Sequence, residues 1–301
     1  MLARMLGIYV ETAIRAELDE VWQKTQNPEL HQRWDLRFSL IRYLPRQEGE
    51  PQRFLYETRI GFGLAIAGEG ESVGERKSDE ERTSALRFWS QDWRSLIAEG
   101  SGYWKYKRGQ GGVQFLTWYD YRVRYGKAGA AFDRLFFRPL IGWATAWSFD
   151  RLRLWIEDEA PPETTLRWSA MYAIARACVI AIWLWHGLVP KLLYADGEEL
   201  GLLAAGGLPA SWLPAIGWIE VVFGVLGVAS WRWRGYFAVT AALMVMAVCG
   251  VAATAPAYLH HAFNPVTLNL AVIGLCAMGW IAMPSAAFAG RCRRRGMKEE
   301  R

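Results

Sequence analysis

The sequence predicts an α+β domain, in which an antiparallel sheet wraps around a long C-terminal helix, followed by an all-α bundle of four transmembrane helices. Charge distribution is the first observation behind this division: residues 1–170 carry 25 basic and 24 acidic side chains, but residues 171–290 carry only four of each. So few charges cannot cover a water-facing surface of 120 residues. Strand-like alternation occurs only in the first segment. We therefore expect domains at 1–158 and 171–290, a linker at 159–170 and a basic tail at 291–301.

In the first domain, residues 8–16 are strand-like, and short helices follow from Glu17 and from Asn27-Pro28. Six extended runs come next, separated by Gly, Pro or acidic clusters, as in a meander of hairpins. Residues 128–158, interrupted only at Pro139, form a long helix with an apolar stripe, and Asp150, Arg151 and Arg153 mark its wetter side. The six extended runs are 36–45, 53–62, 65–78, 83–91, 96–108 and 112–125.

Two of these runs alternate clearly enough to assign their faces. Odd-numbered residues from Val113 to Val123 and even-numbered residues from Phe54 to Phe62 are mostly apolar, and charged residues stand between them. One face of the predicted sheet is therefore core, and the long helix covers it.

This order of elements resembles the START-like helix-grip superfamily, also called SRPBCC or polyketide cyclase-like, over about 150 residues. The runs His31–Asp35 and Phe149–Leu152 look like what such domains carry. The resemblance implies an apolar ligand between sheet and helix: a lipid, a sterol-like molecule, a quinone or an aromatic polyketide. The alternative is that aromatic rings simply fill this space. The side chains expected to line the cavity are Tyr56, Phe88, Phe115, Tyr119, Trp143 and Trp147.

Catalysis and metal binding have little support in the sequence. No phosphate-binding loop or nucleophile–base arrangement occurs in residues 1–170, and the four histidines and four cysteines show no ligand spacing. An acid–base role would need one of Glu57, Glu69 or Asp120 buried with a perturbed pKa. The sequence therefore names no catalytic residue and leaves open whether a reaction is catalysed; we predict no metal and no cofactor other than a quinone or lipid ligand. Nucleic acid is not an expected partner, because basic and acidic residues nearly balance in the first domain.

In the second domain, uncharged stretches of 20 or more residues can each cross about 30 Å of hydrocarbon. A shorter stretch, 177–190, is extended by Arg176 and Lys191, whose charges can reach opposite interfaces. The expected helices are 171–193, 212–231, 236–255 and 265–285. Arginines cluster before the first helix, between the second and third, and after the fourth, so both termini should be cytoplasmic in a multi-pass protein of the cell membrane.

The few polar residues of this domain form the second candidate site. A carboxylate at Glu220 in hydrocarbon needs a partner, and Lys191 is the nearest plausible one, either as a structural lock or as a ligand or proton site. We read His186, one turn before Lys191, as a helix contact. Asn264 and Asn269 flank Pro265 and should satisfy backbone groups there. The candidate set is Arg176, His186, Lys191, Glu220 and Asn269.

The same residues resemble the DoxX-like four-helix membrane family over about 120 residues. The motifs are the arginine opening helix one, the run Trp185–Lys191, Glu220 followed by Gly224, and Phe263-Asn264-Pro265 before a helix with Asn269. Relatives include a subunit of thiosulfate:quinone oxidoreductase and partners in thiol-oxidative-stress systems. The resemblance implies a quinone-linked redox component with a membrane redox partner.

Three functions remain open: a membrane-bound domain that binds a hydrophobic small molecule, a quinone-linked redox component, and a non-catalytic membrane scaffold. The Arg-rich tail after residue 290 is expected to bind anionic headgroups of the bilayer, and its cations would favour the thiolate of Cys292.

Overall fold

The computed structural model describes residues 7–262 and 264–294 and divides the chain into two compact units. We call Met1–Thr165 together with Ala287–Arg301 the N-terminal domain, and Leu166–Ala286 the membrane domain. The residues that follow the last transmembrane helix therefore belong with the N-terminal domain.

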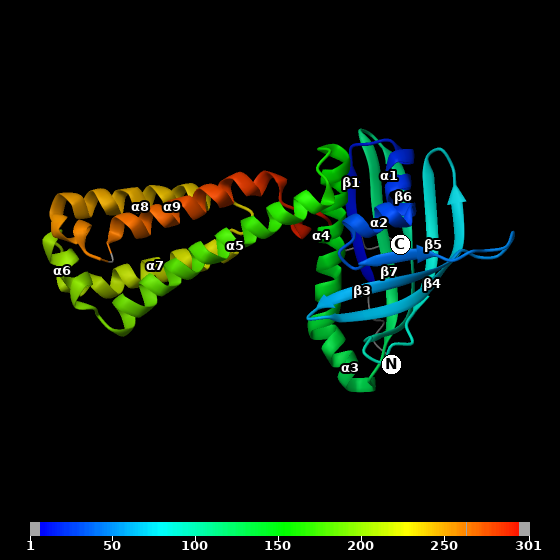
Figure 1. Cartoon of the computed structure of the whole chain (residues 1–301), viewed down its shortest axis with the longest axis horizontal. Coiled ribbons are helices and arrows are strands. Elements are labelled where there is room, and N and C mark those ends of the chain that lie inside the picture. Colours follow the sequence, from blue (N-terminus) through cyan, green and yellow to red (C-terminus); the bar gives the residue numbers. More distant parts are fainter. Residues whose placement is uncertain (1–6, 263, 295–301) are drawn as a thin grey trace, which may run out of the picture. The chain divides into compact units, whose positions relative to one another are not determined.

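The N-terminal domain contains a seven-stranded antiparallel sheet in the order β1-β7-β6-β5-β4-β3-β2, which confirms the expected meander (Figure 1). β2 is shorter than expected, because the chain turns at Asp35, where the amide of Phe38 donates to the Asp35 carbonyl. Gly111 and Gly112, both at positive φ, close the turn between β6 and β7. The strands are β1 Ile8–Ile14, β2 Leu40–Tyr43, β3 Arg53–Gly61, β4 Leu64–Lys77, β5 Glu81–Trp89, β6 Ile97–Gly109 and β7 Gly112–Val123.

Short helices α1 (Leu18–Gln26) and α2 (Pro28–Trp34) follow β1, and the Asn27 side chain caps α2 by accepting from the amides of Glu29 and Leu30. After β7 the chain runs through α3 (Gly126–Phe132), the π-helical turn η1 (Asp133–Phe137) and the long helix α4 (Arg138–Glu157). Pro139 lies in the first turn of α4, where a missing amide hydrogen costs no bond, so it does not break the helix there.

The core lies between one face of the sheet and α4. Phe115 of β7 stacks on Phe149 of α4 with ring centroids 4.4 Å apart, and Trp34 packs edge-on against both. The odd-numbered residues of β7 face this core, as predicted. On β3 the prediction holds only in part: Ile60 and Phe62 are 61% and 106% exposed, because the β3–β4 hairpin tip extends beyond the core.

The segment after the last transmembrane helix docks on α4 and β1. The buried Asp150 carboxylate accepts from the amide of Phe288 (2.7 Å) and from Arg291 (3.0 Å), and the indole of Trp147 donates to the Ala287 carbonyl (3.0 Å). Arg293 and Glu11 then form an antiparallel bridge on the edge of the sheet. The described part of the tail is thus bound to protein, which corrects the expectation of a free headgroup anchor from residue 291 onward; residues 295–301 lie outside the described part.

This docking also shows that the side of α4 expected to face solvent is largely covered. Asp150 is fully buried under the C-terminal segment, and Arg151 is 4% exposed because its guanidinium donates to the carbonyls of Arg33, Trp34 and Pro162. Cys292 is buried as well, and burial raises the pKa of its thiol to about 12, which opposes the thiolate expected there.

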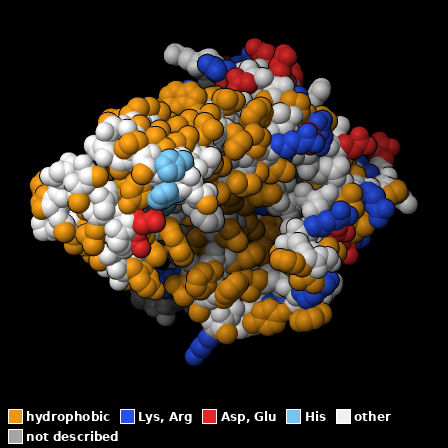
Figure 2. Space-filling view, turned by 60° about the vertical axis from the view of Figure 1, so that its left-hand side comes forward, with side chains coloured by type: hydrophobic (Ala, Val, Ile, Leu, Met, Phe, Trp, Pro, Cys, Tyr) orange, Lys and Arg blue, Asp and Glu red, His pale blue; other side chains and the backbone are white. Residues whose placement is uncertain are grey.

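Among the residues that the structure describes, four helical segments are long and apolar enough to cross a bilayer: Pro162–Leu193, which begins in the last residues of the N-terminal domain, and Ala210–Ala229, Gly235–Thr254 and Pro265–Ser285 of the membrane domain. The first begins at Pro162 in place of residue 171, so most of the expected linker is helical. Hydrophobic side chains cover much of this domain in Figure 2, and Trp218, Ile219 and Ile281 are more than half exposed. Its elements are α5 Pro162–His186, η2 Gly187–Leu193, α6 Gly197–Ala205, α7 Leu213–Ala229, α8 Gly235–Thr254 and α9 Pro265–Ala282.

Candidate functional site

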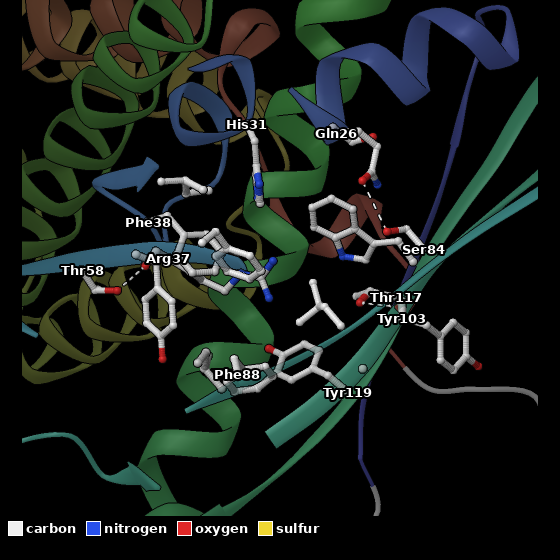
Figure 3. A pocket seen from close by; sticks show the side chains of 18 of the residues that line it. Gln26, His31, Arg37, Phe38, Thr58, Ser84, Phe88, Tyr103, Thr117 and Tyr119 are labelled. Carbon is white, nitrogen blue, oxygen red and sulfur yellow. Dashed lines mark hydrogen bonds between the residues drawn. The ribbon is translucent and has the colours of Figure 1, made fainter. Parts of the chain in front are cut away.

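A cavity of about 170 Å³ lies in the N-terminal domain between the sheet, α2 and α4. Most of its wall is aromatic or aliphatic, and Figure 3 shows His31, Arg37 and Tyr119 among the polar side chains around it. Polar groups also come from Gln26 and Ser84, which are hydrogen-bonded to each other. The apolar lining includes Phe38, Ile41, Phe54, Tyr56, Leu86, Phe88, Ile97, Trp104 and Ile141.

Three of the six predicted lining residues, Tyr56, Phe88 and Tyr119, do line this cavity. The other three lie elsewhere. Phe115 is fully buried in the core against Phe149, and Trp147 is turned toward Ala287. Trp143 stacks on Trp147 and is 41% exposed.

Glycines opposite the aromatic rings give the rings room to lie flat against the sheet. Phe54 pairs across the sheet with Gly70, Tyr56 with Gly68, and Tyr119 with Gly102. A Cβ at these glycines would lie 2.2–2.4 Å from the facing aromatic side chain. Any larger residue there would push an aromatic side chain away from the sheet. The sequence signal was the pair of Gly-x-Gly patterns, 68–70 in β4 and 100–102 in β6, which the sequence reasoning missed.

The polar end of the cavity is a buried charge cluster on the turn after α2. The carboxylate of Asp35 accepts from Arg37 Nε (2.9 Å) and Nη2 (2.6 Å), and its Oδ2 lies 3.0 Å from His31 Nε2. Ser148 of α4 holds the turn by accepting from the amide of Leu36. Figure 3 shows the Arg37 guanidinium reaching toward the middle of the cavity, near the Tyr119 hydroxyl.

These contacts set the protonation states of the cluster. Burial lowers the pKa of His31 despite the nearby carboxylate, so its imidazole is neutral at pH 7. Burial alone would raise the pKa of Asp35, but Arg37 and His31 hold it well below the usual range. Asp35 in turn keeps the pKa of Arg37 above its ordinary value against burial. The cluster is therefore one carboxylate, one guanidinium and a neutral imidazole, with no net charge.

The carboxylates considered for acid–base chemistry do not face the cavity. Glu57 pairs with Arg59, Glu69 with Arg53, and Asp120 with Arg138. Glu57 and Asp120 alternate with lining residues along their strands, and Glu69 lies between Gly68 and Gly70, which pair with the lining residues Tyr56 and Phe54, so all three point to the opposite face of the sheet. Arg37 was missed at the sequence level, where the only signal was a charged pair, Asp35 and Arg37, in an otherwise apolar stretch after a short helix.

In the membrane domain, Lys191 pairs with Glu220, as expected: the ammonium lies 3.1 Å from Glu220 Oε2. It also lies 2.9 Å from Glu199 Oε1 and donates to the His186 carbonyl. Glu199, on the loop helix α6, was not among the predicted partners. Gly187 lets η2 approach α7 closely, since a Cβ there would lie 2.5 Å from the Gly217 carbonyl oxygen.

The other two members of the predicted polar set, Arg176 and Asn269, lie apart from Lys191 and Glu220. Arg176 is fully buried and donates to the carbonyls of Gly227, Ser230 and Trp233, so it caps the C-terminal end of α7 and does not reach an interface as a free charge. Asn269 lies on α9, and within the described chain no hydrogen bond joins it to Lys191 or Glu220. Asn264 caps α9 by accepting from the Thr267 amide.

Solved structures similar to the chain include the di-domain aromatase/cyclase StfQ of the steffimycin biosynthetic pathway, with 12% identity and a TM-score of 0.37. That match covers 52% of this chain, and the chain spans about half the length of StfQ (52%). The hypothetical protein jhp0584 of Helicobacter pylori matches with 17% identity and a TM-score of 0.40, over 50% of this chain and 86% of the other. At these identities and scores the matches do not bear on activity.

Two sequence comparisons concern the membrane domain and the chain as a whole. Residues 180–277 match the model of the DoxX-like family. The uncharacterised membrane protein YndG of Bacillus subtilis (strain 168) is 48% identical over 210 residues, which covers 68% of this chain and 78% of YndG. The chain is therefore a membrane protein of the YndG family, in which a helix-grip domain is followed along the sequence by a DoxX-like membrane domain.

Proposed function

We propose that the N-terminal domain binds one small, uncharged and largely apolar molecule that carries a carbonyl or hydroxyl oxygen. The observation that carries this proposal is the cavity itself: an apolar space with one buried polar cluster at its end. Pockets of this kind, mostly apolar with a few convergent polar groups, are typical of small-molecule sites.

The size of the cavity limits the ligand. A cavity of about 150 Å³ lined by apolar side chains is large enough for benzene, and this one is about 170 Å³. The space suits a single ring, or one end of a longer molecule whose remainder lies outside. A quinone or phenol ring fits this limit, whereas a fused polycyclic polyketide or a sterol would not fit inside the cavity as a whole.

The charge of the cluster limits the ligand further. Both oxygens of Asp35 are already bonded to Arg37, so the guanidinium charge is compensated before any ligand binds. An anionic ligand would bring an unpaired charge into a low-dielectric space, at a cost of several kcal/mol. A neutral oxygen needs only a donor, which the Arg37 guanidinium can supply; the Tyr119 hydroxyl already donates to Thr145 Oγ1, because Thr145 itself donates to the Ile141 carbonyl.

The ligand would meet the domain on the cytoplasmic side of the cell membrane. Arg232 and Arg234 lie between α7 and α8, whereas the loops 194–211 and 256–264 contain no Lys or Arg. Positively charged loops are retained in the cytoplasm, which supports cytoplasmic termini and a ligand taken from the inner leaflet or the cytosol.

The test is mass spectrometry of small molecules released from the full-length protein after purification in mild detergent. Leu86→Phe fills part of the cavity, and Leu40→Phe on β2 is the matched control, since Leu40 is 43% exposed and does not line the cavity. We expect one defined molecule from the wild type and from Leu40→Phe, and its loss from Leu86→Phe. A quinone retained equally by Leu86→Phe would place the site in the membrane domain and favour the redox function. Release of nothing from the wild type would also refute the proposal.

A further inference from the structure

One side of the helical segment α3–η1–α4 is an exposed apolar stripe. Its five large side chains recur at helical spacing, and each is between 41% and 66% exposed. The opposite side is fixed to the sheet, because the buried Asp133 accepts from the Tyr121 hydroxyl (2.7 Å) and pairs with Arg138 (2.9 Å). The stripe consists of Phe132, Leu135, Phe136, Leu140 and Trp143.

Further along α4, beyond the stripe, lie residues that bind the chain near the ends of its transmembrane segments. Trp143 stacks on Trp147, whose indole donates to the carbonyl of Ala287, two residues after the last transmembrane segment ends at Ser285. On the same helix, Arg151 donates to the carbonyl of Pro162, where the first transmembrane segment begins. α4 is thus bonded to the chain at the start of the first transmembrane segment and directly after the last one.

The charges around the stripe have one sign. Lys127 and Arg134 are exposed, and the single acidic residue between 126 and 149 is the buried Asp133. A helix with Phe, Leu and Trp on one side and basic residues beside them is suited to the boundary between headgroups and acyl chains. Each basic residue near an anionic surface adds about 1 kcal/mol.

We propose that this stripe binds the cytoplasmic surface of the lipid bilayer, with Phe132, Leu135 and Phe136 in the headgroup–acyl boundary and Lys127 and Arg134 on anionic headgroups. The continuity of α4 with both membrane connections selects lipid as the occupant over a second protein. The inference rests on exposure, charge and chain connection, and it does not depend on a ligand in the cavity.

The test places an environment-sensitive fluorophore on the full-length protein in vesicles of phosphatidylcholine and phosphatidylglycerol. The background is Cys178→Ser with Cys249→Ser, which removes the two exposed cysteines. Leu135→Cys carries the label on the stripe, and Glu48→Cys carries it on the exposed β2–β3 loop as the control. We expect lipids with a quencher on the acyl chain to quench the label at 135, with a blue-shifted emission, and to leave the label at 48 unchanged.

Equal responses at 135 and 48 would overturn the proposal. So would cross-linking of two copies through residue 135 without lipid quenching, because that result assigns the stripe to a dimer interface. In a second variant, Lys127→Glu with Arg134→Glu should reduce quenching at 135 in vesicles that contain phosphatidylglycerol. Unchanged quenching there would refute the role of the two basic residues.

Discussion

Gly70→Ala should close the cavity by moving one ring. A Cβ at position 70 would lie 2.3 Å from Cζ and 2.8–2.9 Å from both Cε atoms of Phe54, and these three atoms are its nearest neighbours. Ordinary contacts begin at 3.4 Å, so the ring must move by at least 1.1 Å. The backbone of β4 lies behind the new methyl group, and the ring can move only away from the sheet, toward the cavity that Phe54 lines.

The expected cost is that of overpacking, about 1–3 kcal/mol. For a domain of this size that corresponds to a fall in Tm of roughly 2–12 °C. Thermal unfolding of the full-length protein in detergent measures the change, and release of small molecules from the same preparation reports on the cavity. Gly74→Ala is the matched control on the same strand, because no atom lies within 4 Å of its Cβ position. It should change stability by no more than about 0.5 kcal/mol.

The identity of the moving ring is checked by a double-mutant cycle. Phe54→Leu removes the ring that the new methyl group displaces, so the double variant should recover stability relative to the sum of the two single changes, by about 0.5–3 kcal/mol. Equal Tm values for Gly70→Ala and Gly74→Ala, or strict additivity with Phe54→Leu, would refute the argument that this glycine holds the cavity open.

Two further predictions concern buried titratable groups. Burial lowers the pKa of His31 in the folded protein, so below about pH 6.5 the unfolded chain binds more protons than the folded one. The free energy of unfolding should therefore decrease as the pH is lowered below about 6.5, by at most about 1.4 kcal/mol per pH unit. His31→Gln should remove this component of the pH dependence of Tm, and an identical profile would contradict it. Asp150→Ala removes the carboxylate that accepts from Arg291 and the Phe288 amide and that pairs with Arg153, so it should cost at least about 1.5–3 kcal/mol and expose the C-terminal segment to protease. Asp150→Asn, which keeps an acceptor oxygen, should lose less, and equal protease resistance in Asp150→Ala and the wild type would show that this carboxylate does not hold the segment.

Local patterns were enough to predict the order of elements. Alternation with turn residues marks strands wherever one face is buried, and composition marks transmembrane helices because lipid excludes charge. The side of a long helix that faces a cavity is harder to predict, because successive residues are about 100° apart and α4 is apolar on several sides. The sequence therefore suggested Trp143 and Trp147 where Ile141 in fact lines the space.

The other missed features depend on contacts far apart in the chain. The bridge between Glu11 and Arg293 joins residues at opposite ends of the sequence, and no periodicity in either segment indicates it. From the sequence, we expect the charge of Arg176 to reach the interface. In the structure its guanidinium donates to three carbonyl groups at and just after the end of α7. The sequence gives no sign that Arg37 is other than a surface charge, because its buried partner Asp35 is recognised only in the folded structure.

The two membrane connections bear on how a ligand could reach the cavity. A domain hung from one flexible linker could carry its ligand away from the bilayer, but here α4 is bonded to Pro162 on one side and to Ala287 and Phe288 on the other. The chain between Ser285 and Ala287 reaches only about 7 Å when extended, so Asp150 and Trp147 tie α4 to the chain directly after the last transmembrane segment. A ligand could reach the cavity from the bilayer or from solution. The Asp150→Ala variant separates these routes: freeing the C-terminal segment should impair uptake of a bilayer-dissolved ligand and leave uptake from solution intact.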